Sequence, residues 1–177
     1  MENSKKLEDY VINIEDFPEP GVLFRDITGI LNDAEGLKLA VDMLAEAIKD
    51  VEFDAVAALE ARGFFFGMPI AYLFNKPFIP IRKKGKLPRK TVEETYALEY
   101  GSATIEMHED AVRPGDRVII IDDLVATAGT AAAACKLIEG RGGSVAGLYF
   151  VIELAGFEGR KVLDGHPVTS LITYEGK

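Results

Sequence analysis

The sequence predicts an α/β fold with a mostly parallel central sheet flanked by helices. Apolar, strand-like runs alternate with helix-like runs along the chain, as in folds whose parallel strands are joined by helical crossovers. The clearest run, residues 118–121, is apolar at every position, which indicates a strand buried on both faces. Two adjacent carboxylates, Asp122 and Asp123, follow this run, and a turn of small residues leads into an alanine-rich helix from residue 131.

Composition indicates a single globular domain, residues 1–177, in the cytoplasm. The chain is 48% hydrophobic and 28% charged, and its net charge of −9 argues against a nucleic-acid or anionic-membrane partner. No apolar leader is visible, and the longest uncharged apolar run, residues 63–74, is too short for a bilayer. The single cysteine, Cys135, excludes an internal disulfide, fits a reducing compartment and is expected in the core.

Local patterns define the other elements. Asn32 or Asp33 is expected to cap an amphipathic helix, and Pro69 is tolerated in the following helix if it falls in the first turn. Strand-like alternation predicts an antiparallel flap that ends at His108, which is expected on the surface. In chain order we expect a short helix and lead-in within residues 1–16, a turn at 17–21, a helix at 33–50, a strand at 55–59, a helix at 64–74, a strand at 78–81, the flap around 96–107, the strand and helix described above, a strand at 145–154, a helical stretch near 156–163 and a strand at 168–174.

Polar residues follow several of these strands, where open α/β sheets bind ligands. Besides the acid pair after residue 121, the sequence Glu-Ala-Arg-Gly follows the strand at 55–59. The turn before residue 131 leads into a helix N-terminus, whose free N–H groups favour an anion such as phosphate. Carboxylates beside such a phosphate site suit a phosphorylated sugar, since the acids can accept hydrogen bonds from its hydroxyls.

A basic loop, residues 82–90, carries six basic side chains in nine positions. It also follows a strand, so it suits a polyanionic ligand bridged by a metal, and a solvated surface loop is the alternative. Several other nucleotide and catalytic sites are excluded, because the sequence lacks GxxxxGK[ST], GxGxxG, GxSxG, CxxC and HExxH motifs.

The run VIIIDDLVATAGT, residues 118–130, resembles the phosphoribosyl-pyrophosphate (PRPP) signature of type I phosphoribosyltransferases. Four further stretches resemble the adenine phosphoribosyltransferases within that family, in the same order and at similar spacing. These are FPEPGVLFRDIT (17–28), EARGF (60–64), IRKKGKLP (81–88) and YALEYGSATIEMHEDA (96–111). The resemblance extends from about Leu7 to Tyr174.

This resemblance implies a reaction in which adenine and PRPP give AMP and pyrophosphate through an oxocarbenium-like sugar, with Mg²⁺ as cofactor. It also implies a homodimer, a small N-terminal hood that reads adenine (about residues 1–32) and a mobile catalytic flap (about 83–107). The metal is expected to be held mainly by PRPP or pyrophosphate, with no protein ligand assigned directly.

The resemblance also assigns roles to individual residues. Glu99 is implied as the general acid/base, and Arg62, Asp122 and Asp123 are the other implied catalytic residues. The peptide bond between Glu60 and Ala61 is expected to be cis. The implied substrate contacts are Leu23, Phe24 and Arg25 for adenine, with Phe24 stacking on the base; Tyr100 beside Glu99; Arg62, Arg82, Lys83 and Lys86 for pyrophosphate; Asp122 and Asp123 for ribose; and Ala126, Thr127, Ala128, Gly129 and Thr130 for the 5′-phosphate.

One position departs from the family pattern. Ala128 stands where the phosphate loop usually has glycine, and alanine would be strained there if the position needs a positive φ. Three other functions are weighed against the adenine enzyme: a phosphoribosyltransferase for another base, a PRPP-binding regulator and a phosphosugar-binding domain. The acidic chain leaves no room for a DNA-binding helix-turn-helix, and the FRD and LEYG stretches disfavour another base.

Overall fold

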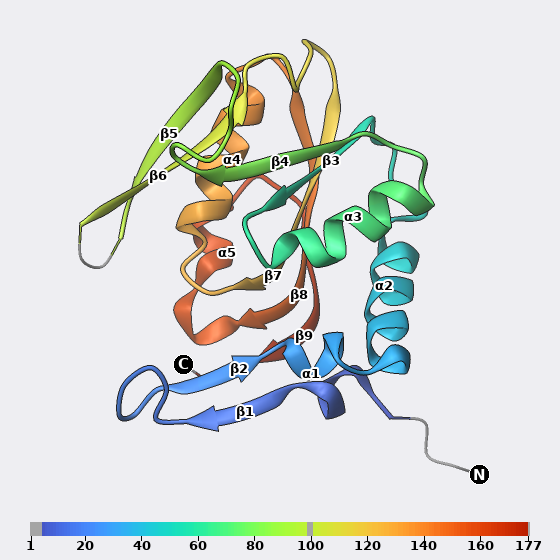
Figure 1. The fold of residues 1–177 in the computed structure, drawn as a ribbon, viewed down its shortest axis with the longest axis vertical. Helices are drawn as coiled ribbons and strands as arrows, with labels where there is room; N and C mark the ends of the chain where they lie inside the picture. Colours follow the sequence, from blue (N-terminus) through green and yellow to red (C-terminus); the bar gives the residue numbers. More distant parts are fainter. Residues whose placement is uncertain (1–4, 99–100, 177) are drawn as a thin grey trace.

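The computed structural model describes residues 5–98 and 101–176 and confirms the predicted class (Figure 1). Its main sheet has the strand order β5-β6-β4-β3-β7-β8-β9. The pairs from β4 through β3, β7 and β8 to β9 are parallel, whereas β6 runs antiparallel to both β4 and β5. The strands are β3 (Ala55–Leu59), β4 (Phe78–Lys83), β5 (Thr91–Ala97), β6 (Ser102–His108), β7 (Arg117–Val125), β8 (Ser144–Leu154) and β9 (Val168–Tyr174).

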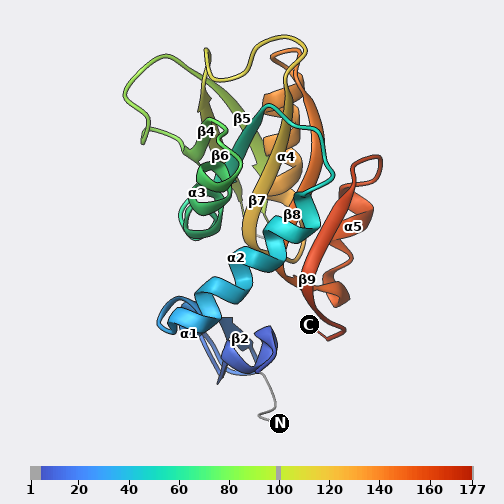
Figure 2. The same cartoon turned by 90° about the vertical axis from the view of Figure 1, so that its right-hand side faces the viewer.

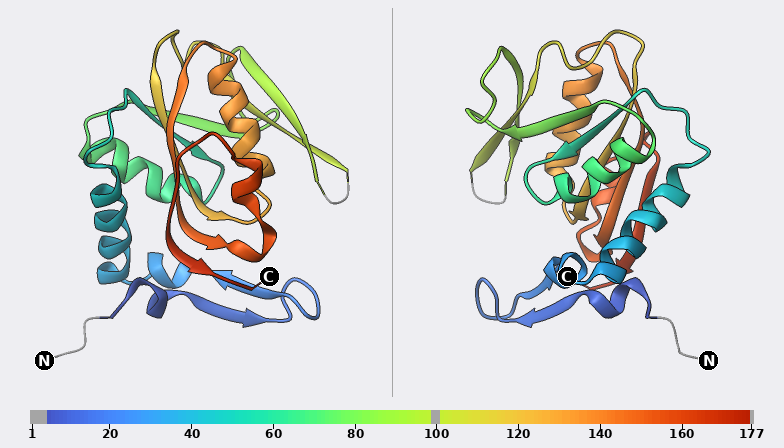
Figure 3. Two further views of the ribbon diagram at one scale, coloured as in Figure 1. Left: turned by 180° about the vertical axis from the view of Figure 1, so that it is seen from behind. Right: turned by 45° about the vertical axis from the view of Figure 1, so that its right-hand side comes forward.

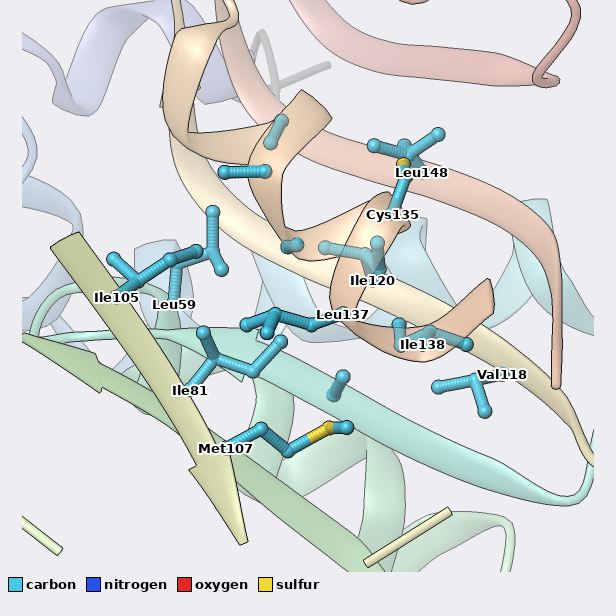
Figure 4. Close-up of a cluster of buried hydrophobic side chains, with 14 of the residues drawn as sticks. Leu59, Ile81, Ile105, Met107, Val118, Ile120, Cys135, Leu137, Ile138 and Leu148 are labelled. Atoms are coloured by element: carbon cyan, nitrogen blue, oxygen red, sulfur yellow. The ribbon is translucent and has the colours of Figure 1, made fainter. Parts of the chain in front are cut away.

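Helices cover both faces of this sheet, as the apolar run of β7 requires (Figures 2 and 3). Val118 and Ile120 belong to the core beneath α4, whereas Ile119 and Ile121 belong to the core beneath α2 and α3. This division follows from the two-residue period of a strand. Figure 4 shows the first core, in which Cys135 is buried as predicted. The helices are α2 (Ala34–Ile48), α3 (Gly63–Leu73), α4 (Gly129–Glu139) and the short α5 (Gly159–Val162), which follows the 3₁₀ turn η2 (Ala155–Phe157).

The two longer helices before β4 lie close to their predicted positions. The Asp33 carboxylate caps α2 by accepting hydrogen bonds from the N–H groups of Glu35 (2.9 Å) and Gly36 (3.1 Å). The condition set for Pro69 is not met, because Pro69 lies beyond the first turn of α3. A proline there leaves the carbonyl of Phe65 without its helical donor. Phe65 lies on the exposed side of α3, where water can solvate that carbonyl.

The N-terminal segment contains a strand that the sequence did not indicate. Residues 1–16 were expected to give only a short helix and a lead-in. The structure has the 3₁₀ turn η1 (Leu7–Tyr10) followed by β1 (Ile12–Glu15), which pairs with β2 (Leu23–Asp26). This hairpin and α1 (Thr28–Leu31) lie beneath the lower ends of β8 and β9 in Figure 1. The Arg25 guanidinium stacks 4.0 Å from the ring centroid of Tyr174, which joins the hairpin to the end of β9.

The prediction for His108 was also wrong, because its side chain is buried with 9% exposure rather than on the surface. Its acidic neighbours in the sequence suggested an exposed position. However, β6 is an inner strand between β4 and β5, and His108 is paired with Thr91 of β5 rather than lying in a loop beyond the strand. In the part of the chain that is described, no helix combines the length and apolar character needed to cross a membrane.

Candidate functional site

A cleft of about 250 Å³ lies at the carboxyl ends of β3, β4 and β7. Six of the predicted site residues line it together, although they come from three separate parts of the chain. They are Arg62, Arg82, Lys83, Asp122, Asp123 and Thr130. The sheet topology explains this meeting, because the neighbouring parallel strands end at the same edge.

The turn between β3 and α3 brings Arg62 to the acid pair. The Glu60–Ala61 peptide bond is cis, as the family resemblance implied. Gly63 lets this turn approach β7, because a Cβ atom at that position would lie 2.7 Å from Asp122 Oδ1 and 2.9 Å from the Ile121 carbonyl oxygen. The close approach allows Arg62 Nε to lie 2.8 Å from Asp123 Oδ2.

The acid pair is held at high electrostatic cost. Asp123 is 3% exposed, and Asp122 Oδ1 accepts a hydrogen bond of 2.9 Å from the Asp123 N–H. Burial, followed by the charge of Asp123, raises the pKa of Asp122 well above its usual value. Burial also raises the pKa of Asp123, although the Arg62 guanidinium opposes that shift. A ligand that brings hydroxyl donors or positive charge to these carboxyls would relieve the cost.

Arg62 also links the cleft to the N-terminal hairpin. Its guanidinium carbon lies 5.9 Å from the ring centroid of Phe24, and this ring contacts Phe17 edge-on at 5.1 Å. The predicted aromatic residue therefore reaches the border of the site. By contrast, Leu23 lines a separate hollow at the hairpin, and the Arg25 side chain contacts Asn13 as well as Tyr174.

A second cleft, of about 190 Å³, lies over the loop that precedes α4. It shares Asp122, Leu124 and Thr130 with the first cleft, so the two are continuous. No side chain in the described chain caps the N-terminus of α4, which leaves its first N–H groups available to an anion. All five predicted phosphate-loop residues line this second cleft: Ala126, Thr127, Ala128, Gly129 and Thr130.

Ala128 itself adopts a left-handed conformation with φ 62° and ψ 9°. The position therefore has the positive φ for which glycine is preferred, and the departure from the family pattern places an alanine in it. The Ala128 methyl group is buried in the core beneath α4. The burial of this methyl group offsets part of the free-energy cost of the left-handed backbone conformation.

The basic residues at the end of β4 are fixed by Glu60. Glu60 Oε1 accepts a hydrogen bond of 2.9 Å from Arg82 Nη2, and Glu60 Oε2 accepts one of 3.0 Å from the Lys83 N–H. The Arg82 side chain is the main cause that lowers the pKa of Glu60. Of the three basic-loop residues predicted to bind pyrophosphate, Arg82 and Lys83 line the first cleft, whereas Lys86 lines neither cleft.

Sequence reasoning missed Tyr96, a residue of β5 that lines the first cleft. Its hydroxyl oxygen accepts a hydrogen bond of 2.8 Å from Thr130 Oγ1. Its strand context predicted the flap but gave no sign of this partner, which is far away in the sequence. The other flap residues assigned to the site, Glu99 and Tyr100, lie outside the described residues, so their roles stay predictions.

Within residues 5–98 and 101–176, no three His, Cys, Asp or Glu side chains are grouped as candidate metal ligands. The acid pair at Asp122 and Asp123 supplies two carboxylates at most. This donor set fits Mg²⁺, which commonly keeps several waters and uses one or two carboxylates together with substrate phosphates.

Comparisons with known proteins agree with this geometry. Residues 28–174 match the family model described as the phosphoribosyl transferase domain. The chain is 53% identical over 173 residues to an adenine phosphoribosyltransferase of Agathobacter rectalis, covering 98% of this chain and 99% of that protein. It is 55% identical, with the same coverage of both chains, to an adenine phosphoribosyltransferase of Lachnoclostridium phytofermentans.

Solved structures give the same result. The adenine phosphoribosyltransferase of Thermoanaerobacter pseudethanolicus superposes with a TM-score of 0.92 at 47% identity, covering 96% of this chain and 100% of that one. The enzyme of Saccharomyces cerevisiae, solved with adenine and an imino-altritol bisphosphate, has a TM-score of 0.87 at 37% identity, covering 93% and 96% of the two chains.

Proposed function

This chain belongs to the phosphoribosyl transferase family and, within it, to the adenine phosphoribosyltransferases, and we propose that its two clefts carry out the reaction of that family. It is a purine salvage enzyme that transfers the 5-phosphoribosyl group of PRPP to adenine, giving AMP and pyrophosphate. The observation that carries this function is the shared cleft, where carboxylates, cations and an open helix N-terminus meet. These three kinds of group match the ribose hydroxyls, the diphosphate and the 5′-phosphate of PRPP.

In the proposed reaction, the bond from ribose C1 to the diphosphate oxygen breaks and a bond from C1 to adenine N9 forms. The sugar gains positive charge on the way, so Asp122 and Asp123 favour the transition state by their negative charge. Arg62, Arg82, Lys83 and Lys86 stabilise the charge on the leaving pyrophosphate. The N–H groups of residues 126–130, with the Thr127 and Thr130 hydroxyls, hold the 5′-phosphate.

Adenine binding is assigned to the N-terminal hood, about residues 1–32. Phe24 stacks on the base, and backbone groups of Leu23 and Arg25 contact its hydrogen-bonding edge. Glu99 takes the N9 proton as the new bond forms, with Tyr100 beside it. The flap, about residues 83–107, closes over both substrates and excludes water, which would otherwise hydrolyse PRPP. The contact of Phe24 with Arg62 supports this assignment, because it joins the base-binding segment to the diphosphate cations.

Mg²⁺ is the proposed cofactor, held mainly by the phosphates of PRPP and pyrophosphate. When bound, it supplies positive charge that neutralises the diphosphate. Asp122 and Asp123 are the residues of the cleft that could also reach it.

The proposed working form is a cytoplasmic homodimer of a single domain. Support for the dimer comes from an exposed apolar face on α3, formed by Phe65, Met68, Tyr72 and Leu73. Tyr72 and Leu73 also line an apolar hollow between α2 and α3. A second copy of the chain is the proposed occupant of this face, because large exposed apolar patches mark sites of association.

A panel of bases tests the function directly. Purified protein incubated with PRPP and Mg²⁺ is expected to form AMP from adenine and to release an equal amount of pyrophosphate, measured by liquid chromatography and a coupled pyrophosphate assay. Hypoxanthine, guanine, xanthine and orotate are expected to give little product. Asp122→Asn combined with Asp123→Asn serves as the inactive control. Turnover with another base and none with adenine would overturn the assignment.

A further inference from the structure

The basic loop between β4 and β5 is built around one buried carboxylate, Glu106. Glu106 lies on β6 and is 3% exposed. Its Oε1 atom accepts hydrogen bonds from two consecutive backbone groups of the loop, the N–H of Lys86 at 2.9 Å and that of Leu87 at 2.8 Å. Gly85 precedes them with φ 84°, a conformation that turns both N–H groups toward the same oxygen.

The hydrogen bonds from the loop backbone offset the cost of burying the Glu106 carboxylate. Burial by itself would raise the pKa of Glu106, but hydrogen bonds from the backbone of Leu87, Gly85 and Lys86 together lower it. A buried carboxylate that lost these donors would remain desolvated without compensation. The loop in turn would lose the acceptor of the Leu87 N–H, and the Lys86 N–H would keep only its longer contact of 3.3 Å with the Lys83 carbonyl oxygen. The two parts therefore stabilise each other.

Contacts also connect Glu106 to the cleft. The carbonyl oxygen of Lys86 accepts a hydrogen bond of 3.1 Å from Arg82 Nη1, while Arg82 Nη2 binds Glu60 at 2.9 Å. The Arg82 guanidinium is thus held between Glu60 and the loop backbone that Glu106 fixes. Arg82 lines the cleft, so a shift of this backbone would move a cation at the site.

Apart from Glu60, which binds Arg82 and the Lys83 N–H at the end of β4, the other acids paired with this loop contact exposed lysine or arginine side chains. Glu93 Oε2 lies 2.7 Å from Lys84 Nζ, and Asp110 pairs with Arg89 at 2.5 Å. Exposed pairs of this kind contribute little, because water solvates both partners when they separate. Glu93 also lies directly opposite Glu106 in the pairing of β5 and β6, which makes it a matched control.

We propose that Glu106 is a positioning residue for the diphosphate half of the substrate. By fixing the backbone of residues 85–87 it sets where Arg82 and Lys86 present their charge, without touching the substrate itself. The inference rests on the proposed function of the cleft and adds a residue that the family resemblance did not assign. The part of the substrate concerned is the diphosphate leaving group of PRPP, so the affinity for adenine should not depend on Glu106.

Kinetics of three variants test this role. Glu106→Ala is expected to raise the KM for PRPP about tenfold while the KM for adenine changes less than about twofold, because backbone hydrogen bonds to a charged acceptor are lost beside the diphosphate site only. Glu106→Gln keeps an acceptor oxygen and should restore most of the PRPP affinity. Glu93→Ala should resemble the wild type. An unchanged KM for PRPP in Glu106→Ala, or equal increases in both KM values, would contradict the proposal.

Two further measurements do not depend on catalysis. Limited trypsin digestion should cut Glu106→Ala faster than Glu93→Ala after Lys84 and Lys86, and added pyrophosphate should slow the wild-type cleavage. If Glu106→Ala does not fold, hydrogen exchange of the wild type decides: the N–H group of Leu87, which donates to Glu106 Oε1, should be protected, and rapid exchange there would overturn the inference. Inactivity of the wild type with adenine would instead count against the proposed function and leave these two readouts interpretable.

Discussion

At the scale of single residues, Ala128 carries a backbone cost that can be measured. A left-handed conformation costs a residue with a Cβ atom roughly 1–2 kcal/mol, whereas glycine pays none of it. Ala128→Gly removes that cost but also removes a buried methyl group, about 0.8 kcal/mol, and adds unfolded-state entropy of about 0.5–1 kcal/mol. We therefore expect the free energy of unfolding in urea to stay within about 0.5 kcal/mol of wild type.

The same substitution one helical turn later provides the control. Ala132 lies inside α4, and its N–H donates a hydrogen bond of 2.9 Å to the Ala128 carbonyl oxygen. Because Ala132 has ordinary helical geometry, Ala132→Gly gains nothing from the backbone and should lose about 1 kcal/mol. Equal losses at the two positions would mean that the conformation of Ala128 carries no measurable strain.

At the scale of elements, the flap strand β5 is joined to the start of α4 by Tyr96. The Tyr96 hydroxyl oxygen accepts a hydrogen bond of 2.8 Å from the Thr130 hydroxyl, so the Tyr96 O–H can itself donate to an anion in the cleft that both residues line. Tyr96→Phe should therefore raise the KM for PRPP about 10–100-fold, since a hydrogen bond to a charged group contributes about 1.5–3 kcal/mol. Steady-state kinetics with adenine at saturation measure this effect.

A second contact between the same two elements separates this role from simple docking of the flap. Lys136 Nζ lies 3.1 Å from Glu94 Oε1 at an exposed position on α4. Lys136→Met removes that pair and should leave the KM for PRPP unchanged, because exposed ion pairs contribute little. If both variants weaken PRPP binding alike, flap docking rather than the tyrosine hydroxyl explains the effect.

The elements also show which features a sequence reveals. The strands around residues 55–59 and 118–121, helix α2 and the phosphate loop were predictable, because each follows from local periodicity, capping or turn chemistry, although β7 continues past the acid pair to Val125. Strand β1 was missed because it is short, exposed and stabilised by pairing with β2. Glu106, Tyr96 and the burial of His108 depend on partners brought near by the sheet order, and no local pattern encodes that order.

At the scale of the whole molecule, the exposed apolar face of α3 would link assembly to catalysis in the proposed homodimer. Tyr72 is 84% exposed and Met68 51%, which is unusual for apolar side chains that cluster on one helix. The first residue of α3, Gly63, directly follows Arg62, which forms the ion pair with Asp123. A partner packed on α3 would therefore hold the β3–α3 turn as well as cover the apolar face.

Tyr72→Lys tests this connection, because a charged side chain at the centre of an apolar interface is left desolvated. Light scattering should give the wild type about twice the 19.3 kDa chain mass and the variant about one chain mass. Turnover should fall about 10–100-fold, since small displacements of positioning groups have large effects on rate. Val162→Lys changes an exposed apolar residue on α5 and should alter neither mass nor turnover. A monomeric wild type would contradict the proposed dimer. A monomeric variant with full turnover would show that the position of Arg62 does not depend on dimer formation.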